Sequence, residues 1–189
     1  MRGAAGPRRT AGGRRCDDKP LKHDPFPRDH TAAAWVVHCD GSAVPNPGRM
    51  GLGAVVVEPD GATRHVLSEA THFTGCNNEA ELRSLMLGLQ CVLRRAPTPA
   101  HPVQVFSDNS VLVAQLAGDG AVLPIARLAD LFDEARALLT ACGDAHVHWI
   151  PRHRNGEADA LARAALGLAP KASTPHHLRK KKNKKPLRD

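Results

Sequence analysis

Four acidic residues are the best candidates for chemistry in this sequence, because each stands at the end of a predicted strand or in a predicted helix. They are Asp40, Glu81, Asp108 and Asp159. Asp40 follows the apolar run 34–39 and precedes a Gly-Ser pair and a Pro/Asn/Gly turn. This order is typical of a buried strand that delivers an acid to the edge of a sheet. Taken alone, Asp40 is more simply explained as the cap of a hairpin turn, so its role depends on what other segments bring to the same place.

Apolar periodicity predicts the elements that carry these acids. Strands are expected near residues 34–40, 52–57, 64–70, 103–106 and 146–150, and helices near residues 77–96, 109–117, 124–139 and 155–165. The first three strands are separated only by turns, of which Glu58-Pro59-Asp60-Gly61 has strong turn chemistry, so they form an antiparallel meander. The later strands alternate with helices, which favours parallel pairing and right-handed crossovers. The economical arrangement is one mixed α/β sheet with helices on both faces.

This arrangement can bring the four acids together. Asp40 and Asp108 end the first and fourth strands, so they emerge at one sheet edge if those strands are parallel neighbours. Glu81 is expected in the first turn of its helix and Asp159 one turn into the last helix, where either can point over that edge. Each acid alone has a plainer explanation, as a partner of the helix dipole, a helix cap or a solvated surface group. Their joint placement on separate elements is what favours a site.

Clustered carboxylates predict a divalent cation. Unpaired acids that pack closely repel one another, and a cation relieves that repulsion. A set of oxygen ligands without Cys or paired His suits Mg²⁺ or Mn²⁺ rather than Zn²⁺. The chemistry that follows from such a site is two-metal hydrolysis of a phosphodiester.

Four segments together resemble the type 1 ribonuclease H family, over about residues 34–168. They are Asp40-Gly41-Ser42 with Asn46-Pro47-Gly48, Asn77-Asn78 with Glu81-Leu82, Ser107-Asp108-Asn109-Ser110, and Trp149-Ile150-Pro151-Arg152-His153 with Asn155-Gly156-Glu157-Ala158-Asp159. Each segment is a weak signal alone, but the four occur in the family's order and with approximately its spacing. The resemblance implies a ribonuclease H-like fold, whose five-stranded mixed sheet has three antiparallel strands followed by two parallel ones. It also implies an endonuclease that cleaves the RNA strand of RNA–DNA hybrids with two Mg²⁺ or Mn²⁺ ions per active site.

The resemblance assigns catalytic roles residue by residue. The positions that match the family's four metal-binding acids are Asp40, Glu81, Asp108 and Asp159. By similarity, Asp40 bridges both ions and Asp159 helps to hold the ion that activates the attacking water. Glu81 and Asp108 hold the ion that stabilises the leaving 3′-oxygen. Glu79 is not the matching acid, because the family's acid directly precedes the Leu.

The same resemblance points to residues around the acids. His153 matches the family's mobile histidine, which is thought to assist proton transfer or product release, although a solvated loop histidine is the plainer alternative. Asn46, Asn77 and Asn78 match positions that contact the RNA strand through 2′-hydroxyls and base edges, which is how a protein tells RNA from DNA. We also place Asn155 among the candidate substrate contacts. Capping of the nearby helices is the alternative role for the asparagines that stand at helix starts.

The chain departs from the family pattern in two places. The connection Gly118–Leu123 is short and has no Lys, Arg or Trp, where well-studied family members often carry a basic, Trp-containing protrusion. Cys76 also stands where a phosphate-contacting Thr is common. Recognition of the DNA strand is therefore less well explained than the metal chemistry, and we expect the basic tails to supply backbone contacts, above all the run 179–185.

The distribution of charge predicts the domain organisation. Of the 189 residues, 1–33 form a basic segment of net charge +4, 34–168 form a body of net charge −4, and 169–189 form a Lys-rich segment of net charge +7. We expect two disordered basic tails around one catalytic domain; the alternative is that the tails only improve solubility. No run is apolar enough to span a membrane, and the five cysteines show no CxxC pair or disulfide framework. We therefore expect a cytoplasmic, monomeric protein without membrane contacts.

Two other functions stay open at the level of sequence. One is a related nuclease for another substrate, such as double-stranded RNA, because the basic protrusion is missing. The other is a non-catalytic nucleic-acid-binding module of the same fold. Retention of all four acids and His153 argues against the second, because pure binding does not need clustered negative charge facing a polyanion.

Overall fold

The structure is a computed structural model that describes residues 33–117 and 125–170. The two predicted basic tails lie almost wholly outside the described residues, as does the connection Gly118–Leu123. Among the residues described, no helix is both long and apolar enough to cross a bilayer.

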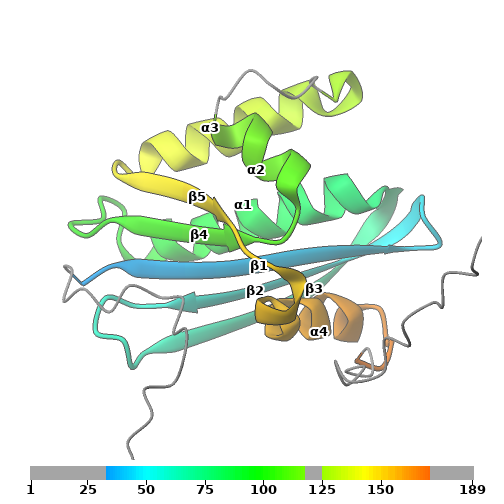
Figure 1. The fold of residues 1–189 in the computed structure, drawn as a ribbon, viewed down its shortest axis with the longest axis horizontal. Coiled ribbons are helices and arrows are strands. Elements are labelled where there is room, and N and C mark those ends of the chain that lie inside the picture. Colours follow the sequence, from blue (N-terminus) through cyan, green and yellow to red (C-terminus); the bar gives the residue numbers. More distant parts are fainter. Residues whose placement is uncertain (1–32, 118–124, 171–189) are drawn as a thin grey trace, which may run out of the picture. The chain divides into compact units, whose positions relative to one another are not determined.

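One five-stranded sheet organises the fold (Figure 1). Its strands are β1 (Trp35–Val44), β2 (Gly48–Val57), β3 (Arg64–Gly75), β4 (Val103–Ser107) and β5 (Ala145–Trp149), in the spatial order β3-β2-β1-β4-β5. The pairs β1–β2 and β2–β3 are antiparallel, whereas β1–β4 and β4–β5 are parallel. The predicted mixed sheet, with three antiparallel strands followed by two parallel ones, is confirmed.

The first strand is longer than the sequence predicts. We expected β1 to end at Asp40, but it continues through Gly41 and Ala43 to Val44. The residues that read as the start of a turn are small and pair with the beginning of β2, where Val44 lies opposite Arg49. The antiparallel ladder with β2 therefore holds the strand in place beyond Asp40, and Asp40 is an internal strand residue.

The helices cover both faces of the sheet, as predicted. They are α1 (Asn77–Arg95), α2 (Ser110–Ala117), the 3₁₀ turn η1 (Ala126–Leu128), α3 (Ala129–Ala141), the 3₁₀ turn η2 (Arg152–Arg154) and α4 (Gly156–Ala165). Of the helices in the described residues, α1, α2 and α3 lie on one side of the sheet, and α4 lies against β1, β2 and β3 on the other (Figure 1). The third predicted helix begins as the separate turn η1, and its expected first residue, Pro124, lies outside the described residues.

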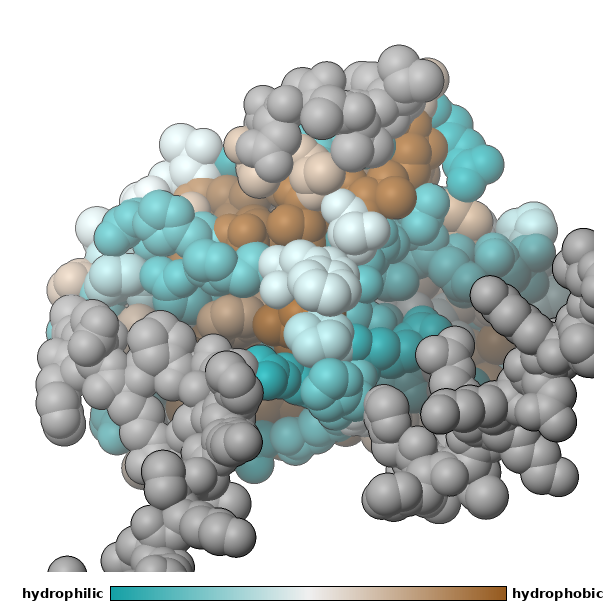
Figure 2. Space-filling model, in the orientation of Figure 1, coloured by the Kyte–Doolittle hydropathy of each residue, from teal (hydrophilic) through white to brown (hydrophobic). Residues whose placement is uncertain are grey.

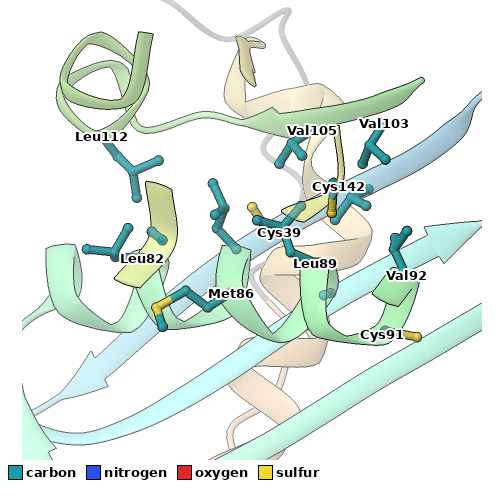
Figure 3. Close-up of a cluster of buried hydrophobic side chains, with 14 of the residues drawn as sticks. Cys39, Leu82, Met86, Leu89, Cys91, Val92, Val103, Val105, Leu112 and Cys142 are labelled. Atoms are coloured by element: carbon teal, nitrogen blue, oxygen red, sulfur yellow. The ribbon is translucent and has the colours of Figure 1, made fainter. Parts of the chain in front are cut away.

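The core lies between α1 and the middle of the sheet (Figure 3). Leu82 and Leu89 of α1 pack with Val103 and Val105 of β4, and all four side chains are fully buried. Burial of each such side chain stabilises the fold by roughly 1.5–3 kcal/mol relative to leaving it in water. Helix α1 is thereby fixed against the sheet, which matters because α1 carries one of the candidate acids. Cysteines Cys39, Cys76, Cys91 and Cys142 are free thiols.

The surface is not uniform. On the face shown in Figure 2, hydrophobic residues gather in the upper part, around α2 and α3, and hydrophilic residues predominate below it. The large hydrophobic side chains most exposed to solvent in the described part of the chain are Val44, Val66, Phe73, Val111 and Trp149. Of these, Trp149 stands directly before the segment that leads to α4, next to the candidate site.

Candidate active site

Asp40 lies where β1 loses its parallel partner. On one side Asp40 pairs with Gly53 of β2. On the other side the ladder with β4 ends at the pair of His38 and Phe106. Asp108 follows Phe106 by two residues, as Asp40 follows His38, so both acids stand just beyond the end of the ladder. The register therefore brings Asp40 and Asp108 to one edge of the sheet.

Four carboxyl groups interact at this point. Asp40 is only 3% exposed, and its Oδ1 accepts a hydrogen bond of 2.9 Å from the backbone N–H of Gly41. Burial raises the pKa of Asp40, and the negative charges of Glu81, Asp108 and Asp159 raise it further, to about 8. A hydrogen bond between the side chains of Asp40 and Asp159 adds to the rise in pKa. Because the pKa of Asp40 is about 8, this carboxyl group is largely protonated near neutral pH, and the four acids carry fewer than four negative charges.

Glu81 reaches this cluster because residue 41 is a glycine. Gly41 follows Asp40 and faces the opposite side of the strand, toward α1. A Cβ atom on Gly41 would lie 2.1 Å from the carbonyl carbon of Ala80 and 2.2 Å from the backbone nitrogen of Glu81. Only glycine allows α1 to approach β1 this closely. Because α1 begins at Asn77, Glu81 is its fifth residue and lies in the second turn, not in the first turn that we expected.

Glu79, the neighbouring acid, is engaged elsewhere. Its Oε1 accepts a hydrogen bond of 3.0 Å from Nε of Arg83, and the two side chains form an ion pair one turn apart along α1. Glu79 is not among the groups that raise the pKa of Asp40. This placement agrees with the choice of Glu81 as the acid that faces the site.

Asp108 is held by the last residue of β5 and by two residues of the segment that joins β5 to α4. Nδ2 of Asn155 donates to Oδ1 of Asp108 at 2.7 Å, and Nε of Arg152 donates to Oδ2 at 3.2 Å. The indole Nε1 of Trp149 donates to the backbone carbonyl of Asp108, also at 3.2 Å. The sequence analysis named Trp149 and Arg152 only as parts of a motif and gave them no role, because nothing in the local sequence indicates which distant acid their side chains meet.

Asn155 corrects two of our expectations. It occupies the position before α4, but its side chain makes no capping hydrogen bond to that helix. Its Nδ2 instead donates to the carbonyl of Cys39 at 2.8 Å as well as to Asp108. Asn155 is 2% exposed and offers no surface to a substrate, so we take it as a residue that positions Asp108 against β1.

Asp159 arrives from the other face of the sheet. It is the fourth residue of α4, and its backbone N–H donates to the carbonyl of Asn155 at 3.1 Å. Helix α4 lies almost directly on β2, because a Cβ atom on Gly53 would lie 2.4 Å from the carbonyl oxygen of Ala158 and 2.5 Å from the nitrogen of Ala162. Gly53 is the partner of Asp40 across the ladder, so this close contact sets Asp159 beside Asp40.

His153 stands at the exposed side of the site. It lies in η2, directly after Arg152 and two residues before Asn155. Its exposure and its place beside residues that contact Asp108 suit a group that meets substrate or water rather than the buried acids. Its catalytic role stays a prediction.

The three asparagines predicted to contact RNA lie together beside a hollow of about 390 Å³. The hollow is lined by Asn46, Pro47, Cys76, Asn77, Asn78 and Arg127. Oδ1 of Asn46 accepts from the backbone N–H of Asn77 at 3.2 Å and so serves the start of α1, whose N-cap residue is Cys76 rather than an asparagine. Arg127 donates to Sγ of Cys76 at 3.0 Å. Sequence reasoning missed Arg127, because no motif marks the first turn of η1.

The donor chemistry of the cluster fits a divalent cation of the Mg²⁺ type. The four acids offer only oxygen atoms, and the buried Asp40 is already under the repulsion that a cation relieves. In the part of the chain that the structure describes, no three His, Cys, Asp or Glu side chains are arranged to hold one ion as they stand. Both carboxylate oxygens of Asp108 accept a hydrogen bond, one from Arg152 and one from Asn155, so an ion at Asp108 would compete with these donors for lone pairs.

Comparison with known proteins agrees with this geometry. A family model described as reverse transcriptase-like matches residues 38–165. The bifunctional protein Rv2228c of Mycobacterium tuberculosis is 36% identical over 136 residues, which cover 71% of this chain and 36% of that protein. The solved N-terminal ribonuclease H domain of Rv2228c, fused to maltose-binding protein, superposes with a TM-score of 0.63 at 32% identity and covers 72% of this chain and 95% of that one.

Two further ribonucleases H have the same fold. Ribonuclease HI of Halobacterium salinarum is 32% identical over 130 residues, which cover 67% of this chain and 61% of that protein. Its crystal structure gives a TM-score of 0.64 at 28% identity, covering 71% of this chain and 98% of that one. LC11-RNase H1, from a compost metagenome, was solved in complex with an RNA/DNA hybrid and gives a TM-score of 0.64 at 26% identity, covering 70% and 96%.

The mixed sheet, the helices on both faces and the four converging acids thus define a ribonuclease H-like α/β domain. The chain belongs to the type 1 ribonuclease H family. It spans about a third of the length of the mycobacterial relative and less than two thirds of the length of the halobacterial one.

Proposed function

We propose that this chain is a metal-dependent endonuclease that hydrolyses the RNA strand of RNA–DNA hybrids. The observation that carries the proposal is Asp40, whose pKa is raised by its burial and by three acids delivered from different elements. Such a cluster opposes the binding of a polyanion unless cations enter it, so it suits catalysis better than passive binding. Family membership supports the reaction, and the relative solved with an RNA/DNA hybrid supports the substrate.

Ribonucleases H generally use divalent metal ions, and we propose two Mg²⁺ or Mn²⁺ ions per site in this chain. Asp40, Glu81, Asp108 and Asp159 are the residues that would hold these ions. When bound, the ions would supply an activated water and neutralise the charge on the leaving oxygen. Asn155 keeps Asp108 beside β1, and Gly41 and Gly53 keep the two helices close enough for their acids to meet Asp40. His153 would exchange a proton with solvent at the exposed side of the site.

We propose that Asn46, Asn77 and Asn78 present hydrogen-bond donors to the RNA strand. Within the described residues each of the three uses its Oδ1 atom internally: Asn46 accepts from Asn77, Asn77 accepts from Ala43 at 2.8 Å, and Asn78 accepts from Asn109 at 3.1 Å. Their Nδ2 groups would then serve as the donors to a strand that lies in the hollow these residues line. Hydroxyl and base-edge acceptors of RNA are the matching partners.

The direct test is a cleavage assay on one labelled hybrid, one RNA duplex and one DNA duplex of the same sequence, with Mg²⁺ or Mn²⁺. Wild type is expected to cut only the RNA strand of the hybrid. Glu81→Gln and Asp40→Asn should lower the rate by at least about 100-fold, since ligands of the ions act together in the transition state. Glu79→Gln is the matched control, because Glu79 lies on the same helix but pairs with Arg83.

Each outcome of the assay decides a separate part of the proposal. If wild type cuts nothing, or if Glu81→Gln cuts as fast as Glu79→Gln, the catalytic proposal is wrong. If the RNA duplex is cut as fast as the hybrid, the chemistry stands and the proposed substrate is wrong.

We further propose that the Lys-rich segment 169–189, which lies almost wholly outside the described residues, binds the nucleic-acid backbone. Deletion of residues 170–189 should weaken binding of the hybrid. It should also flatten the salt dependence of binding, by about 0.9 log units per log unit of salt for each phosphate that the segment neutralises in wild type. Binding isotherms at several salt concentrations, with the nuclease-dead Asp40→Asn variant, measure this slope. An unchanged slope rules the contribution out.

A further inference from the structure

Two different kinds of contact hold the carboxylate of Asp108. Asn155 is 2% exposed and donates to Oδ1 at 2.7 Å, and its amide is anchored a second time on the carbonyl of Cys39. Arg152 donates to Oδ2 at the longer distance of 3.2 Å, through a side chain that is 72% exposed. The contact from Asn155 is therefore made by a buried side chain, whereas the contact from Arg152 is made by a solvent-exposed side chain at the surface.

The side of Asp108 that Arg152 occupies is one that a metal ion would need. Asp108 contributes to the negative charge around Asp40, and its own side chain is only 8% exposed. A guanidinium at Oδ2 lowers the repulsion among the four acids without any ion. It also occupies a lone pair of one oxygen that an ion would use, so the Arg N–H and a cation compete for that oxygen.

We propose that Arg152 is a tethered cation that shares Asp108 with the divalent ion: it pairs with Oδ2 when the ion is absent and must leave for the ion to bind. The inference rests on the proposed function, because it takes the four acids to be the metal site. Asn155 keeps its contact in both states and holds the carboxylate in place while Arg152 exchanges. The exposed position of Arg152 makes this exchange possible without any rearrangement of the core.

A merely structural ion pair makes a different prediction. If Arg152 only fastened η2 to β4, its removal would change the stability of the fold and leave the affinity for metal unaltered apart from a general charge effect. Competition instead requires that removal of Arg152 tighten metal binding. The two explanations therefore predict different changes in the dissociation constant for the metal ion when Arg152 is removed.

The experiment is a titration of the full chain with Mn²⁺ in the absence of nucleic acid, with free Mn²⁺ measured by its electron paramagnetic resonance signal. Arg152→Ala and Arg152→Gln are expected to bind Mn²⁺ about two- to fivefold more tightly than wild type, the range set by the strength of an exposed ion pair. Arg154→Ala is the matched control, because it removes the same charge from the same 3₁₀ turn but from a residue that is not a partner of Asp108. Urea unfolding of each variant establishes that it is folded.

The outcomes separate the two proposals. Tighter binding by both Arg152 variants than by Arg154→Ala supports competition at Asp108. Equal affinities for the Arg152 and Arg154 variants overturn the competition while leaving the metal site intact. If wild type binds Mn²⁺ no better than Asp40→Asn does, the metal site itself is wrong and both proposals fail.

Discussion

The two helices that deliver Glu81 and Asp159 approach Asp40 from opposite faces of the sheet, and they are held in very different ways. Helix α1 has 19 residues, ten of them buried, and it forms part of the main core. Helix α4 has 10 residues, and only Ala158 and Ala162 are buried. Its place on the sheet depends instead on β2 glycines, which let its backbone lie directly on the strand.

Because the two helices are held differently, changes beside them should affect stability and catalysis to different degrees. A helix fixed by many buried side chains cannot move without a large loss of packing energy, whereas a helix held by a few close contacts can move at a smaller cost. We therefore expect changes at the α1 contact to reduce stability and activity together. Changes at the α4 contact should reduce activity more than stability. Each helix has one glycine opposite it near Asp40, so the comparison can be tested with the same substitution on each side.

The largest effect is expected from Gly41→Ala. The added methyl group would meet the backbone of Ala80 and Glu81 at 2.1–2.2 Å, so α1 must move away from β1. Overpacking of this kind costs about 1–3 kcal/mol, and here we expect the upper end because α1 is part of the core. Displacement of Glu81 should lower the cleavage rate by about 100-fold. Urea unfolding and single-turnover cleavage measure the two losses.

Gly156→Ala is the control for this substitution, because a Cβ atom there meets nothing within 4 Å. It should unfold at the urea concentration of wild type and cut at its rate. A Gly41→Ala protein as stable and as active as Gly156→Ala would show that α1 does not need the close approach.

Gly53→Ala is the matching change on the α4 side. Its methyl group would meet the carbonyl oxygen of Ala158 at 2.4 Å and the nitrogen of Ala162 at 2.5 Å. Because α4 buries so little, we expect a loss of only about 1 kcal/mol in the free energy of unfolding, but a loss of about 10- to 100-fold in cleavage as Asp159 moves from Asp40. The same two assays apply. A loss of stability as large as that of Gly41→Ala, with activity retained, would contradict the proposed difference between the helices.

Asp40→Asn tests whether the acids carried by the two helices destabilise the charged form of Asp40. Asp40 has a pKa of about 8 in the folded protein against an ordinary value of 3.8, so the folded state binds the proton more tightly than the unfolded state does. The tighter binding of this proton adds to the free energy of unfolding in full below about pH 4, and this contribution is lost as the pH rises to 8. Without metal, Asp40→Asn should therefore be more stable than wild type at pH 8, by several kcal/mol, and little different near pH 4. Urea unfolding with a chelator at several pH values measures this.

Asp60→Asn is the control for that pH dependence. The pKa of Asp60 is lowered by its hydrogen bonds to Thr63 and Ala62 in an exposed turn, so its contribution is lost only as the pH falls through the acid range. The Asp60→Asn substitution should leave the change in the free energy of unfolding between pH 5 and 8 the same as in wild type. Added Mn²⁺ should stabilise wild type and not Asp40→Asn, and a flat wild-type profile without metal would mean that Asp40 is not under the repulsion we describe.

The sequence predicted the acids of the site because periodicity defines the elements that carry them. Asp40 follows an apolar strand pattern, Asp108 does the same, and Glu81 opens an amphipathic helix, so each signal is local. The predicted end of β1 was wrong because the hydrogen-bonded ladder with β2, and not the local composition, determines where β1 ends. The alternative capping role of Asn155 was wrong for a similar reason, since its side chain binds partners on β1 and at Asp108 instead of the helix.

Side-chain contacts between segments that are distant in the chain could not be predicted from the sequence. Arg152 meets an acid 44 residues earlier in the chain, and Arg127 meets Cys76 51 residues earlier. A glycine also gives no sign of its neighbours. Gly41 reads as part of a turn, yet it is the position through which α1 approaches β1.

The smallest effect is expected from the ion pair that fastens α4 to β3. Nη2 of Arg64 donates to both carboxylate oxygens of Glu157, at 2.8 and 2.9 Å, but both side chains are about half exposed. Such pairs contribute about 0.2–1 kcal/mol, and salt screens them. A double-mutant cycle with Arg64→Ala and Glu157→Ala should give a coupling energy in that range, and cleavage should stay within about twofold of wild type. The exposed pair of Asp133 and Arg136, within α3, is the matched control. A large loss of cleavage in Glu157→Ala alone would mean that surface charge, and not the contact with the glycines of β2, fixes α4 and its acid.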